Sequence, residues 1–224
     1  MRVVVRIGGS VIASPPNPHL ISRYAGVLRK LYLQNHKFVA VTGGGSIARE
    51  FIRVARDAGL NSDEQDEIAI SISRVFAQIL AIKFGGLTLK LIPTSIDEAV
   101  TVFERDGRVF MGGIKPGMTT DTVAAMMASR INADMIIKAT DQDGIYNKDP
   151  RKYPEAEKID HIRFSDLPKI FKGREYKVGI HQILDPKAIE IIGREKIRTV
   201  VLNGFKPENI TAVVNGETIG TEIS

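Results

Sequence analysis

The stretch Phe38-Val39-Ala40-Val41-Thr42-Gly43-Gly44-Gly45-Ser46 runs from an apolar segment straight into a glycine triplet. A short apolar run of this kind predicts a strand that is buried on both faces, as the strands of a parallel sheet are. The glycines predict a tight turn, because they allow dihedral angles that other residues avoid. Val3 to Ile7 lead into Gly8-Gly9-Ser10 in the same way. These two strand-to-glycine units indicate an α/β fold.

Further along the chain, apolar runs alternate with segments of helical pattern. Strands are expected at residues 87–92, 109–111, 135–137 and 197–202, and helices at residues 47–58, 63–84, 120–132, 186–195 and 207–214. Asn17-Pro18 is typical of a helix start, and Ser62-x-x-Gln65 and Ser95-x-x-Glu98 resemble capping boxes. The alternation predicts a three-layer α/β/α sandwich around a mainly parallel sheet, with function at the carboxyl ends of the strands.

The composition describes one domain over residues 1–224, 43% hydrophobic and 25% charged, with no repeat or low-complexity tract. No apolar run reaches the roughly 18 residues of a membrane helix, and Met1 to Arg6 read as a strand rather than a signal peptide, so a cytoplasmic protein is expected. The lack of cysteine excludes disulfides, thiolate zinc sites and cysteine nucleophiles. The net charge of +5 suits nucleic acid, an anionic membrane or phosphorylated ligands, and does not choose among them.

Two later loops also carry polar groups. Residues 112–122 read Gly-Gly-Ile-Lys-Pro-Gly-Met-Thr-Thr-Asp-Thr and lead into an apolar helix, so Thr120 and Asp121 stand at a helix start. Hydroxyls and free N–H groups there can bind an anion, although Thr and Asp also cap helices without any ligand. Residues 138–150 follow a predicted strand with acidic, hydroxyl and aromatic side chains, as a site for a base, a ribose and metal-bound phosphates requires. The Asp-Gly and Asp-Pro pairs in that loop are equally common in plain turns.

The glycine triplet also fits a loose dinucleotide-binding pattern, Gly43-x-Gly45-x-x-Ala48. The dinucleotide fold needs an acidic residue at the end of the next strand, about 20 residues on, and here that distance falls at Asp63 to Glu67 in a predicted helix. The Walker sequence Gly-Lys-Ser/Thr and the protein-kinase triplets His-Arg-Asp and Asp-Phe-Gly are absent from the chain. A different phosphate-binding scheme is required.

In order along the chain, the segments GGS, TGGGS-x-AR, GG-x-x-PG-x-TTDT-x-AA and TD-x-DG-x-Y-x-x-DP resemble those of the amino acid kinase superfamily. Within it, the chain resembles the uridylate kinases of the archaeal type over nearly its whole length. The resemblance implies that ATP phosphorylates UMP to UDP, with Mg²⁺, in pyrimidine nucleotide synthesis. It also implies an N-terminal UMP-binding part at about residues 1–130 and a C-terminal ATP-binding part at about residues 131–224.

Matched by motif, the resemblance assigns roles to residues of all four segments. Asp121 would be the catalytic aspartate that orients cations around the transferred group, with Arg6 and Arg49 among those cations. The residues implied to bind ATP are Gly9, Ser10, Gly45, Arg49, Thr140, Tyr146 and Asp149. Those implied to bind UMP are Gly44, Asp66, Ile114, Lys115, Pro116, Gly117, Met118, Thr119 and Thr120. No protein ligand for the metal is implied, because Mg²⁺ often binds mainly through substrate phosphates and waters.

The chain departs from the family pattern at two places. Arg6 ends an apolar strand where many superfamily members have a lysine beside the phosphates. A guanidinium in a dry sheet is costly without an anion, and arginine keeps the charge of lysine but changes its reach and geometry. The side chain could also extend to solvent at the strand end. Residues 176–181 read Tyr-Lys-Val-Gly-Ile-His where relatives have Lys-Ala-Gly and small hydroxyl residues, so the roles of Lys177 and His181 stay open.

Rival interpretations lie within and outside the superfamily. Isopentenyl phosphate kinases carry Ser-Phe-Gly-His after the glycine triplet, whereas this chain has Ser46-Ile47-Ala48-Arg49. Asp66 and the loop over residues 112–121 argue against aspartate, glutamate and carbamate kinases. A non-catalytic nucleotide-binding protein on the same scaffold is a further alternative, and nucleic-acid binding is the weakest because aromatic residues are only 6%. By resemblance, a homohexamer inhibited by UTP is expected.

Overall fold

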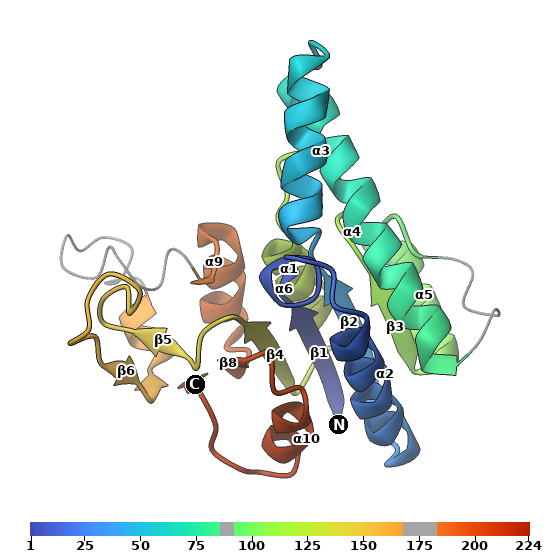
Figure 1. The fold of residues 1–224 in the computed structure, drawn as a ribbon. Coiled ribbons are helices and arrows are strands. Elements are labelled where there is room, and N and C mark those ends of the chain that lie inside the picture. The colour runs from blue at the N-terminus through green and yellow to red at the C-terminus, as the bar shows by residue number, and fades with distance from the viewer. Residues whose placement is uncertain (86–91, 168–182) are drawn as a thin grey trace.

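The computed structural model describes residues 1–85, 92–167 and 183–224, and these form a sheet of seven strands with a separate two-stranded ribbon (Figure 1). The strands are β1 Arg2–Ile7, β2 Lys37–Thr42, β3 Arg108–Met111, β4 Met135–Thr140, β5 Ile145–Tyr146, β6 Lys158–Ile159, β7 His161–Ile162, β8 Thr199–Asn203 and β9 Thr221–Ile223. The order in the large sheet is β3-β2-β1-β4-β8-β9-β7, and neighbours run parallel except for the antiparallel β8–β9 pair. β5 and β6 form the antiparallel ribbon.

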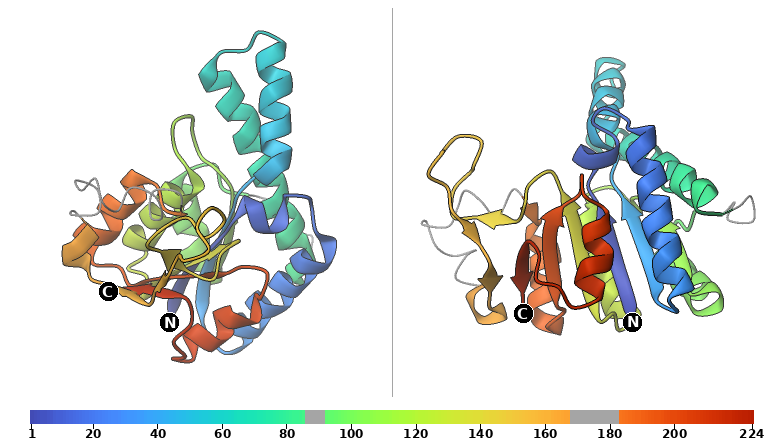
Figure 2. Two further views of the ribbon diagram at one scale, coloured as in Figure 1. Left: turned by 60° about the vertical axis from the view of Figure 1, so that its left-hand side comes forward. Right: turned by 60° about the horizontal axis from the view of Figure 1, so that its bottom comes forward.

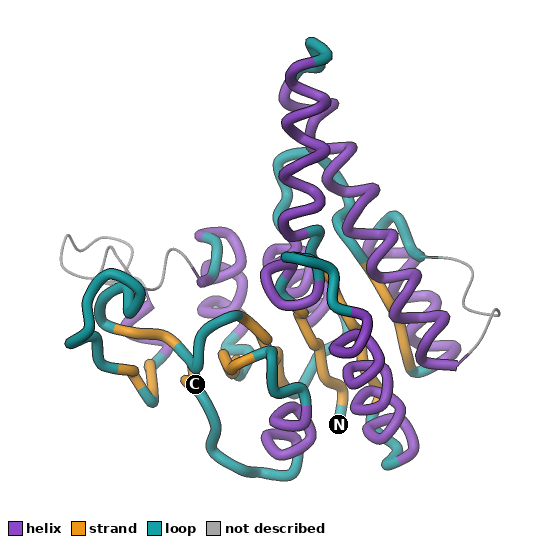
Figure 3. Tube along the Cα trace, viewed as in Figure 1, coloured by secondary structure: helices purple, strands orange, loops and turns teal. Residues whose placement is uncertain are grey.

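Helices cover both faces of the sheet, as two further views show (Figure 2). They are α1 Gly9–Ile12, α2 Pro18–Leu33, α3 Gly45–Asp57, α4 Ser62–Gly85, α5 Ile96–Asp106, α6 Thr120–Arg130, α9 Pro186–Glu195 and α10 Glu208–Val214, with a 3₁₀ turn at Phe164–Asp166. One face packs against α1, α2, α10 and the C-terminal half of α4, and the other against α5, α6 and α9. The pair formed by α3 and the N-terminal half of α4 projects beyond the sheet (Figure 3). The predicted three-layer α/β/α sandwich around a mainly parallel sheet is confirmed.

The pleat of the central strand β1 decides which side chains meet which layer. Val3, Val5 and Ile7 pack in the core on the α2 side, whereas Val4 packs in the core on the α6 side. Because side chains alternate along a strand, Arg6 leaves the sheet on the same side as Val4. A charged side chain therefore stands at the carboxyl end of the central strand, facing α6.

Most of the predicted elements are confirmed, with ends that differ by a few residues. The strand predicted at residues 87–92 lies almost entirely outside the described residues. The sequence does not predict α1 or the short strands β5, β6, β7 and β9, because elements of two to four residues are too short to show a periodic pattern.

Two helix starts have the predicted chemistry. The Asn17 side chain accepts a hydrogen bond from the Leu20 N–H at 3.0 Å, with Pro18 at the first helical position. The Ser95 hydroxyl oxygen accepts one from the Glu98 N–H at 3.2 Å. Both caps fix where a helix begins after a loop.

The capping box predicted at Ser62 is wrong, because Asn61 caps α4. Asn61 Oδ1 accepts hydrogen bonds from the N–H groups of Asp63 and Glu64, at 3.0 and 3.1 Å. The Glu64 carboxylate accepts one in return from the Asn61 N–H at 2.8 Å. Asn is as good a cap as Ser, and its partner three residues on is a glutamate, so the reciprocal box forms one residue earlier.

By length and composition, α4 is apolar enough to cross a membrane, and it is the one such helix among the described residues. In the fold, Phe76, Leu80 and Phe84 of α4 are buried in the core that α2 also covers. Its C-terminal half is thus a core helix of the sandwich, and its N-terminal half pairs with α3.

A buried hydrogen bond fixes α2 beside the first glycine loop. Tyr24 in α2 is fully buried, and its hydroxyl donates to the Gly204 carbonyl at 2.7 Å. Burial raises the pKa of this hydroxyl well above its usual range. A Cβ at Gly204 would lie 2.7 Å from a Val11 methyl and 2.9 Å from the Tyr24 hydroxyl oxygen. The end of β8, α1 and α2 are therefore locked together at this point.

We expect Tyr24→Phe to lower the free energy of unfolding by about 1–3 kcal/mol, because the buried Gly204 carbonyl would lose its donor. Urea denaturation followed by circular dichroism measures the change. Tyr32→Phe is the matched control: the Tyr32 hydroxyl has no hydrogen bond to any described residue, so its loss should cost less than about 0.5 kcal/mol. Equal losses in the two variants would contradict the role given to the Tyr24 bond.

Candidate active site

The first two glycine loops lie against each other at the carboxyl ends of β1 and β2. A Cβ at Gly9 would lie 2.3 Å from the Gly45 nitrogen, and a Cβ at Gly45 would lie 2.3 Å from the Gly9 carbonyl oxygen. Gly45 also has a φ of +59°, which L residues rarely adopt. The two backbones can approach this closely only because both residues are glycine. Their approach places the N-terminus of α3 at the end of the sheet. The Ser46 N–H there already donates to the Ala13 carbonyl at 3.0 Å, and the other N–H groups before Ala48 have no partner within the helix.

Arg6 and Lys138 are cations on neighbouring strands. β1 and β4 pair in parallel with Arg6 opposite Lys138, so both side chains leave the sheet on the α6 side. The Arg6 side chain is 15% exposed and the Lys138 side chain 6%. Two like charges with so little solvent destabilise each other unless an anion lies between them.

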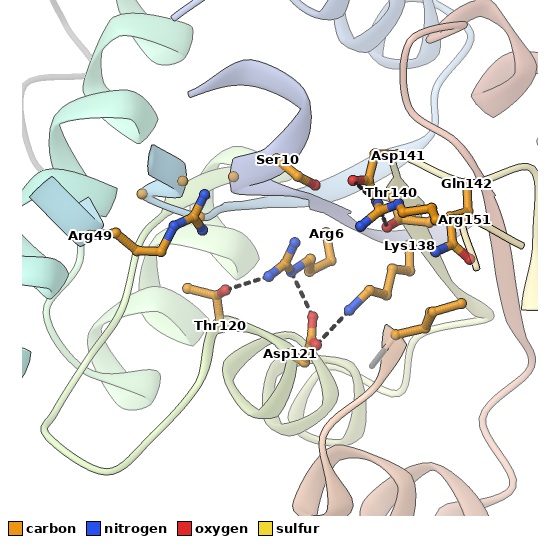
Figure 4. A pocket seen from close by; sticks show the side chains of 15 residues that line it. Arg6, Ser10, Arg49, Thr120, Asp121, Lys138, Thr140, Asp141, Gln142 and Arg151 are labelled. Atoms are coloured by element: carbon orange, nitrogen blue, oxygen red, sulfur yellow. Dashed lines mark hydrogen bonds and ion pairs between the residues drawn. The ribbon is translucent and has the colours of Figure 1, made fainter. Parts of the chain in front are cut away.

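Asp121 supplies that anion from the first turn of α6. Its Oδ1 lies 2.6 Å from Arg6 Nε, and its Oδ2 lies 2.5 Å from Lys138 Nζ. Arg6 also donates a hydrogen bond to the Thr120 hydroxyl at 2.9 Å (Figure 4). The partial positive charge of the helix N-terminus stabilises the carboxylate further. We call Arg6, Asp121 and Lys138 the charge cluster.

The charge cluster holds two positive charges and one negative charge. Burial alone would raise the pKa of Asp121, but Arg6 and Lys138 outweigh it and hold that pKa below its usual range. Burial first and Arg6 second lower the pKa of Lys138 to about 8, against the opposing effect of Asp121. Arg6 Nε and Asp121 Oδ1 form an ion pair without hydrogen-bond alignment, and neither atom is hydrogen-bonded to a described residue. The excess positive charge favours an anionic ligand.

The charge cluster lies in a cavity of about 370 Å³, which we call the first cavity. Its walls come from both glycine loops, the start of α6 and the segment after β4: Arg6, Gly9, Ser10, Gly43, Gly44, Gly45, Arg49, Thr120, Asp121, Lys138, Thr140, Asp141, Gln142, Arg151 and Ile183. In Figure 4, Arg49 and Arg151 stand at opposite ends of this cavity, with the charge cluster between them. Four cations against two carboxylates suit a ligand with several negative charges.

A second cavity, of about 580 Å³, adjoins the first beside α3 and α4. Its lining residues are Gly44, Ala48, Arg49, Ile52, Asp66, Ala69, Ile70, Ser73, Gly113, Lys115, Gly117, Met118, Thr119 and Thr120. α4 holds the loop that closes this cavity: Ser73 Oγ accepts from the Gly113 N–H at 2.7 Å, and Arg74 donates to the Gly113 carbonyl at 3.0 Å. Asp66, near the start of α4, accepts from the Gly117 N–H at 2.8 Å. The second cavity is therefore built by α4 and the glycine loop before α6.

Gly44, Arg49 and Thr120 line both cavities. Arg49, one turn into α3, makes no hydrogen bond or ion pair with another described residue. Ligands in the two cavities would meet beside a free guanidinium, a hydroxyl and a helix N-terminus, with the charge cluster next to them. Such an arrangement holds two reactants in place and neutralises negative charge between them.

The structure brings most of the predicted site residues together. Of those implied to act in catalysis or to bind ATP, the first cavity is lined by Arg6, Gly9, Ser10, Gly45, Arg49, Asp121 and Thr140. Of those implied to bind UMP, the second is lined by Gly44, Asp66, Lys115, Gly117, Met118, Thr119 and Thr120. The predicted residues that line neither cavity are Ile114, Pro116, Tyr146 and Asp149.

Sequence reasoning missed several lining residues, of which Lys138 is the most important. Lys138 follows the apolar run Met135-Ile136-Ile137, which is the same signal that singles out Arg6. Arg151 gives no such signal, since an arginine after Asp-Pro is typical of an exposed turn. Lys177 and His181 lie outside the described residues. No group of three or more His, Asp or Glu side chains that could hold a metal ion occurs in the described part of the chain.

Two adjoining cavities at the carboxyl ends of a parallel sheet, the first of them lined by two buried cations, are the arrangement that a phosphotransferase requires. The chain belongs to the amino acid kinase family, whose model matches residues 1–203. The resemblance expected from the four loops is thereby confirmed.

Relatives that match this chain over nearly their full length are uridylate kinases, which narrows the class of phosphotransferase. A curated uridylate kinase of Methanococcoides burtonii is 40% identical over 222 residues, which cover 99% of this chain and 94% of that protein. One of Methanobrevibacter smithii is 34% identical over 223 residues, or 100% of this chain and 99% of that protein. The crystal structure of uridylate kinase from Archaeoglobus fulgidus has a TM-score of 0.88 and 36% identity, and all of both chains is covered. A UMP kinase structure from Bacillus anthracis, at 20% identity and a TM-score of 0.77, shares the fold over 100% of this chain and 95% of that one.

The charge cluster predicts pKa shifts of opposite sign for Lys138 in two variants. Asp121→Asn removes the carboxylate that favours the charged lysine, so the pKa should fall below about 8. Arg6→Gln removes the neighbouring cation, so the pKa should rise. Since a lysine loses its charge as pH rises through its pKa, Lys138 should become neutral at lower pH in Asp121→Asn than in Arg6→Gln.

An NMR titration of the Lys138 side chain measures both shifts, with Lys138→Arg as the control that assigns the resonance. Shifts of the same sign in Asp121→Asn and Arg6→Gln would contradict the arrangement of the charge cluster.

Proposed function

We infer that this chain transfers the terminal phosphoryl group of ATP to UMP, giving ADP and UDP, in pyrimidine nucleotide synthesis. The observation that carries this inference is the junction of the two cavities at Gly44, Arg49 and Thr120. Phosphoryl transfer requires donor and acceptor phosphates in line and their charge neutralised, with little covalent work for the protein. The full-length similarity to uridylate kinases supports UMP as the acceptor.

The first cavity is proposed to hold ATP. Its glycine loops and the N-terminus of α3 present N–H groups and partial positive charge to phosphate oxygens. The residues proposed to bind ATP are Gly9, Ser10, Gly45, Arg49 and Thr140. Tyr146 and Asp149 are proposed to support the loop after β4. Mg²⁺ would arrive with ATP, held mainly by phosphate oxygens and water, because the Asp121 carboxylate is already engaged by Arg6 and Lys138.

Asp121 is proposed to organise cations rather than to accept a proton. Both of its oxygens face a cation, and a pKa below the usual range keeps the carboxylate ionised at neutral pH. An oxygen of the UMP phosphate attacks the terminal phosphorus, and the bond from that phosphorus to the bridging oxygen breaks, so its electron pair leaves with ADP. Arg6, Lys138 and Arg49 would stabilise the charge on the group in transit.

The second cavity is proposed to hold UMP. Thr119 and Thr120 stand at the N-terminus of α6, where a phosphate is favoured, and Asp66 can accept a hydrogen bond from a ribose hydroxyl. The remaining residues proposed to bind UMP are Gly44, Ile114, Lys115, Pro116, Gly117 and Met118. All residues that line this cavity fall within residues 44–120, whereas the first cavity also uses residues 138–183. This supports a UMP-binding part at about residues 1–130 and a part at about residues 131–224 that completes the ATP site.

A homohexamer is the proposed assembly. Its support is apolar surface along α3 and α4, where the exposed side chains are Phe51, Val54, Val75, Ile79 and Ile82. Exposed apolar side chains along two packed helices favour burial against another surface. UTP is the proposed inhibitor, because it shares the uridine of UMP. A cytoplasmic location is consistent with the absence of cysteine from the sequence.

An ADP-release assay with Mg-ATP tests the function, with UMP, CMP, AMP, isopentenyl phosphate and aspartate as acceptors. UMP should be turned over fastest, and Asp121→Asn should lower kcat by about a hundredfold or more while leaving the KM for UMP nearly unchanged. Turnover of isopentenyl phosphate but not of UMP would contradict the assignment of UMP as the acceptor. An unchanged kcat in Asp121→Asn would reduce Asp121 to a helix cap, and nucleotide binding without turnover would favour a binding protein.

Light scattering after size exclusion tests the assembly. A mass near six times the 24.6 kDa chain is expected. Ile79→Glu on α4 should lower that mass, because a charge would enter the proposed interface. Leu33→Glu is the control, since Leu33 is 74% exposed at the end of α2. A monomeric wild-type chain would contradict the proposal.

A further inference from the structure

Arg151 lines the first cavity at the end away from Arg49, and the proposed reaction gives it no role. Its guanidinium lies 2.5 Å from the Asp141 carboxylate. Asp141 follows directly on Thr140 at the end of β4, so the ion pair ties the loop after β5 back to the cavity wall (Figure 4).

A turn stabilised by Asp149 places Arg151 at this end of the first cavity. Asp149 is only 6% exposed, and its carboxylate accepts a hydrogen bond from the Arg151 N–H at 3.0 Å. The Asp149 carbonyl accepts two more, from the N–H groups of Lys152 and Tyr153, each at 3.0 Å. A buried carboxylate and a carbonyl used in this way fix the backbone that follows them. The direction of Arg151 into the cavity is thus set by the turn and not by Asp141 alone.

The Arg151–Asp141 pair can exchange partners at little cost. The Arg151 side chain is 61% exposed and that of Asp141 29%, and exposed pairs contribute little to stability. In the charge cluster, by contrast, every member is 15% exposed or less. A chain of phosphates carries more charge than one carboxylate, and phosphate oxygens also match the forked donors of a guanidinium. An anionic ligand in the first cavity therefore competes well for Arg151.

We propose that Arg151 binds the phosphates of the donor nucleotide that are not transferred, and that it leaves Asp141 for them when the nucleotide enters. This rests on the proposed function, because it takes the first cavity as the ATP site. The transferred group must lie where the cavities meet, beside Arg49 and Thr120. The other two phosphates then extend past the charge cluster toward Arg151. They remain on the product, so Arg151 binds ADP as well as ATP.

The effect of Arg151 on binding could also be indirect, through neutralisation of Asp141. In that case Arg151→Ala would weaken nucleotide binding only by leaving a free carboxylate in the cavity. The two explanations differ once Asp141 is uncharged. If Arg151 contacts phosphate, its loss still weakens binding in an Asp141→Asn background; if it only neutralises Asp141, its loss there has no effect.

Isothermal titration with ADP on the full chain measures the four affinities: wild type, Arg151→Ala, Asp141→Asn and the double variant. We expect Arg151→Ala to weaken ADP binding about tenfold in both backgrounds, as the loss of a charged hydrogen bond does. Arg151→Lys should fall between wild type and Arg151→Ala, because lysine keeps the charge without the fork. The affinity for UMP should change less than about twofold in every variant, since Arg151 does not line the second cavity.

Lys152→Ala is the matched control. It removes the same charge one residue away, and the Lys152 side chain has no hydrogen bond or ion pair to another described residue. ADP affinity should stay at the wild-type value. A double variant that binds ADP as tightly as Asp141→Asn, or an equal loss in Lys152→Ala, would overturn the proposal. If the wild-type chain binds ADP but fails to phosphorylate UMP, the proposed function fails while the four affinities still decide the role of Arg151.

Discussion

A carboxylate held between two cations on neighbouring strands is the interaction on which the site depends. Arg6 and Lys138 are opposite each other in the β1–β4 pair, and without Asp121 they would be two like charges in nearly dry surroundings. Breaking a buried ion pair by removing one partner typically costs about 3–5 kcal/mol. The same contacts tie the first turn of α6 to the two central strands. The position of the α6 N-terminus, and of the threonines that line the second cavity, follows from this electrostatic constraint.

The glycines and α4 supply the rest of the frame. Gly9 and Gly45 let two loops touch backbone to backbone, which brings the start of α3 to the cation-bearing strand ends. The N-terminal half of α4 binds the loop before α6 through Asp66, Ser73 and Arg74, and its C-terminal half is part of the hydrophobic core. Formation of the second cavity is therefore coupled to the packing of the sandwich. A loop that is bound to a helix anchored in the core is held more rigidly than a loop without such support.

Local patterns predicted most of the elements, and the resemblance of four loops to the amino acid kinase superfamily predicted about half of the residues that line the cavities. Apolar runs, glycine turns and helix caps depend on neighbouring residues, so they can be recognised in one sequence. Lys138 was missed although it carries the same pattern as Arg6, a charge within an apolar strand. Arg151 could not be found in this way, because its position in the cavity depends on a turn around Asp149 that brings it back to Asp141. Asn61 and Ser62 are adjacent and equally suitable as caps, so the sequence pattern does not distinguish them, and the structure shows that Asn61 is the cap.

Patterns along the chain are sufficient to predict the succession of the longer strands, glycine loops and helices, and their resemblance to known motifs indicates the family and the two kinds of ligand to expect. The tertiary structure shows which cation opposes which, which carboxylate lies between them, and that two cavities meet at Gly44, Arg49 and Thr120. Strand register and helix placement result from the packing of segments far apart in the chain, and a shift of one residue along β4 would turn Lys138 to the other face of the sheet.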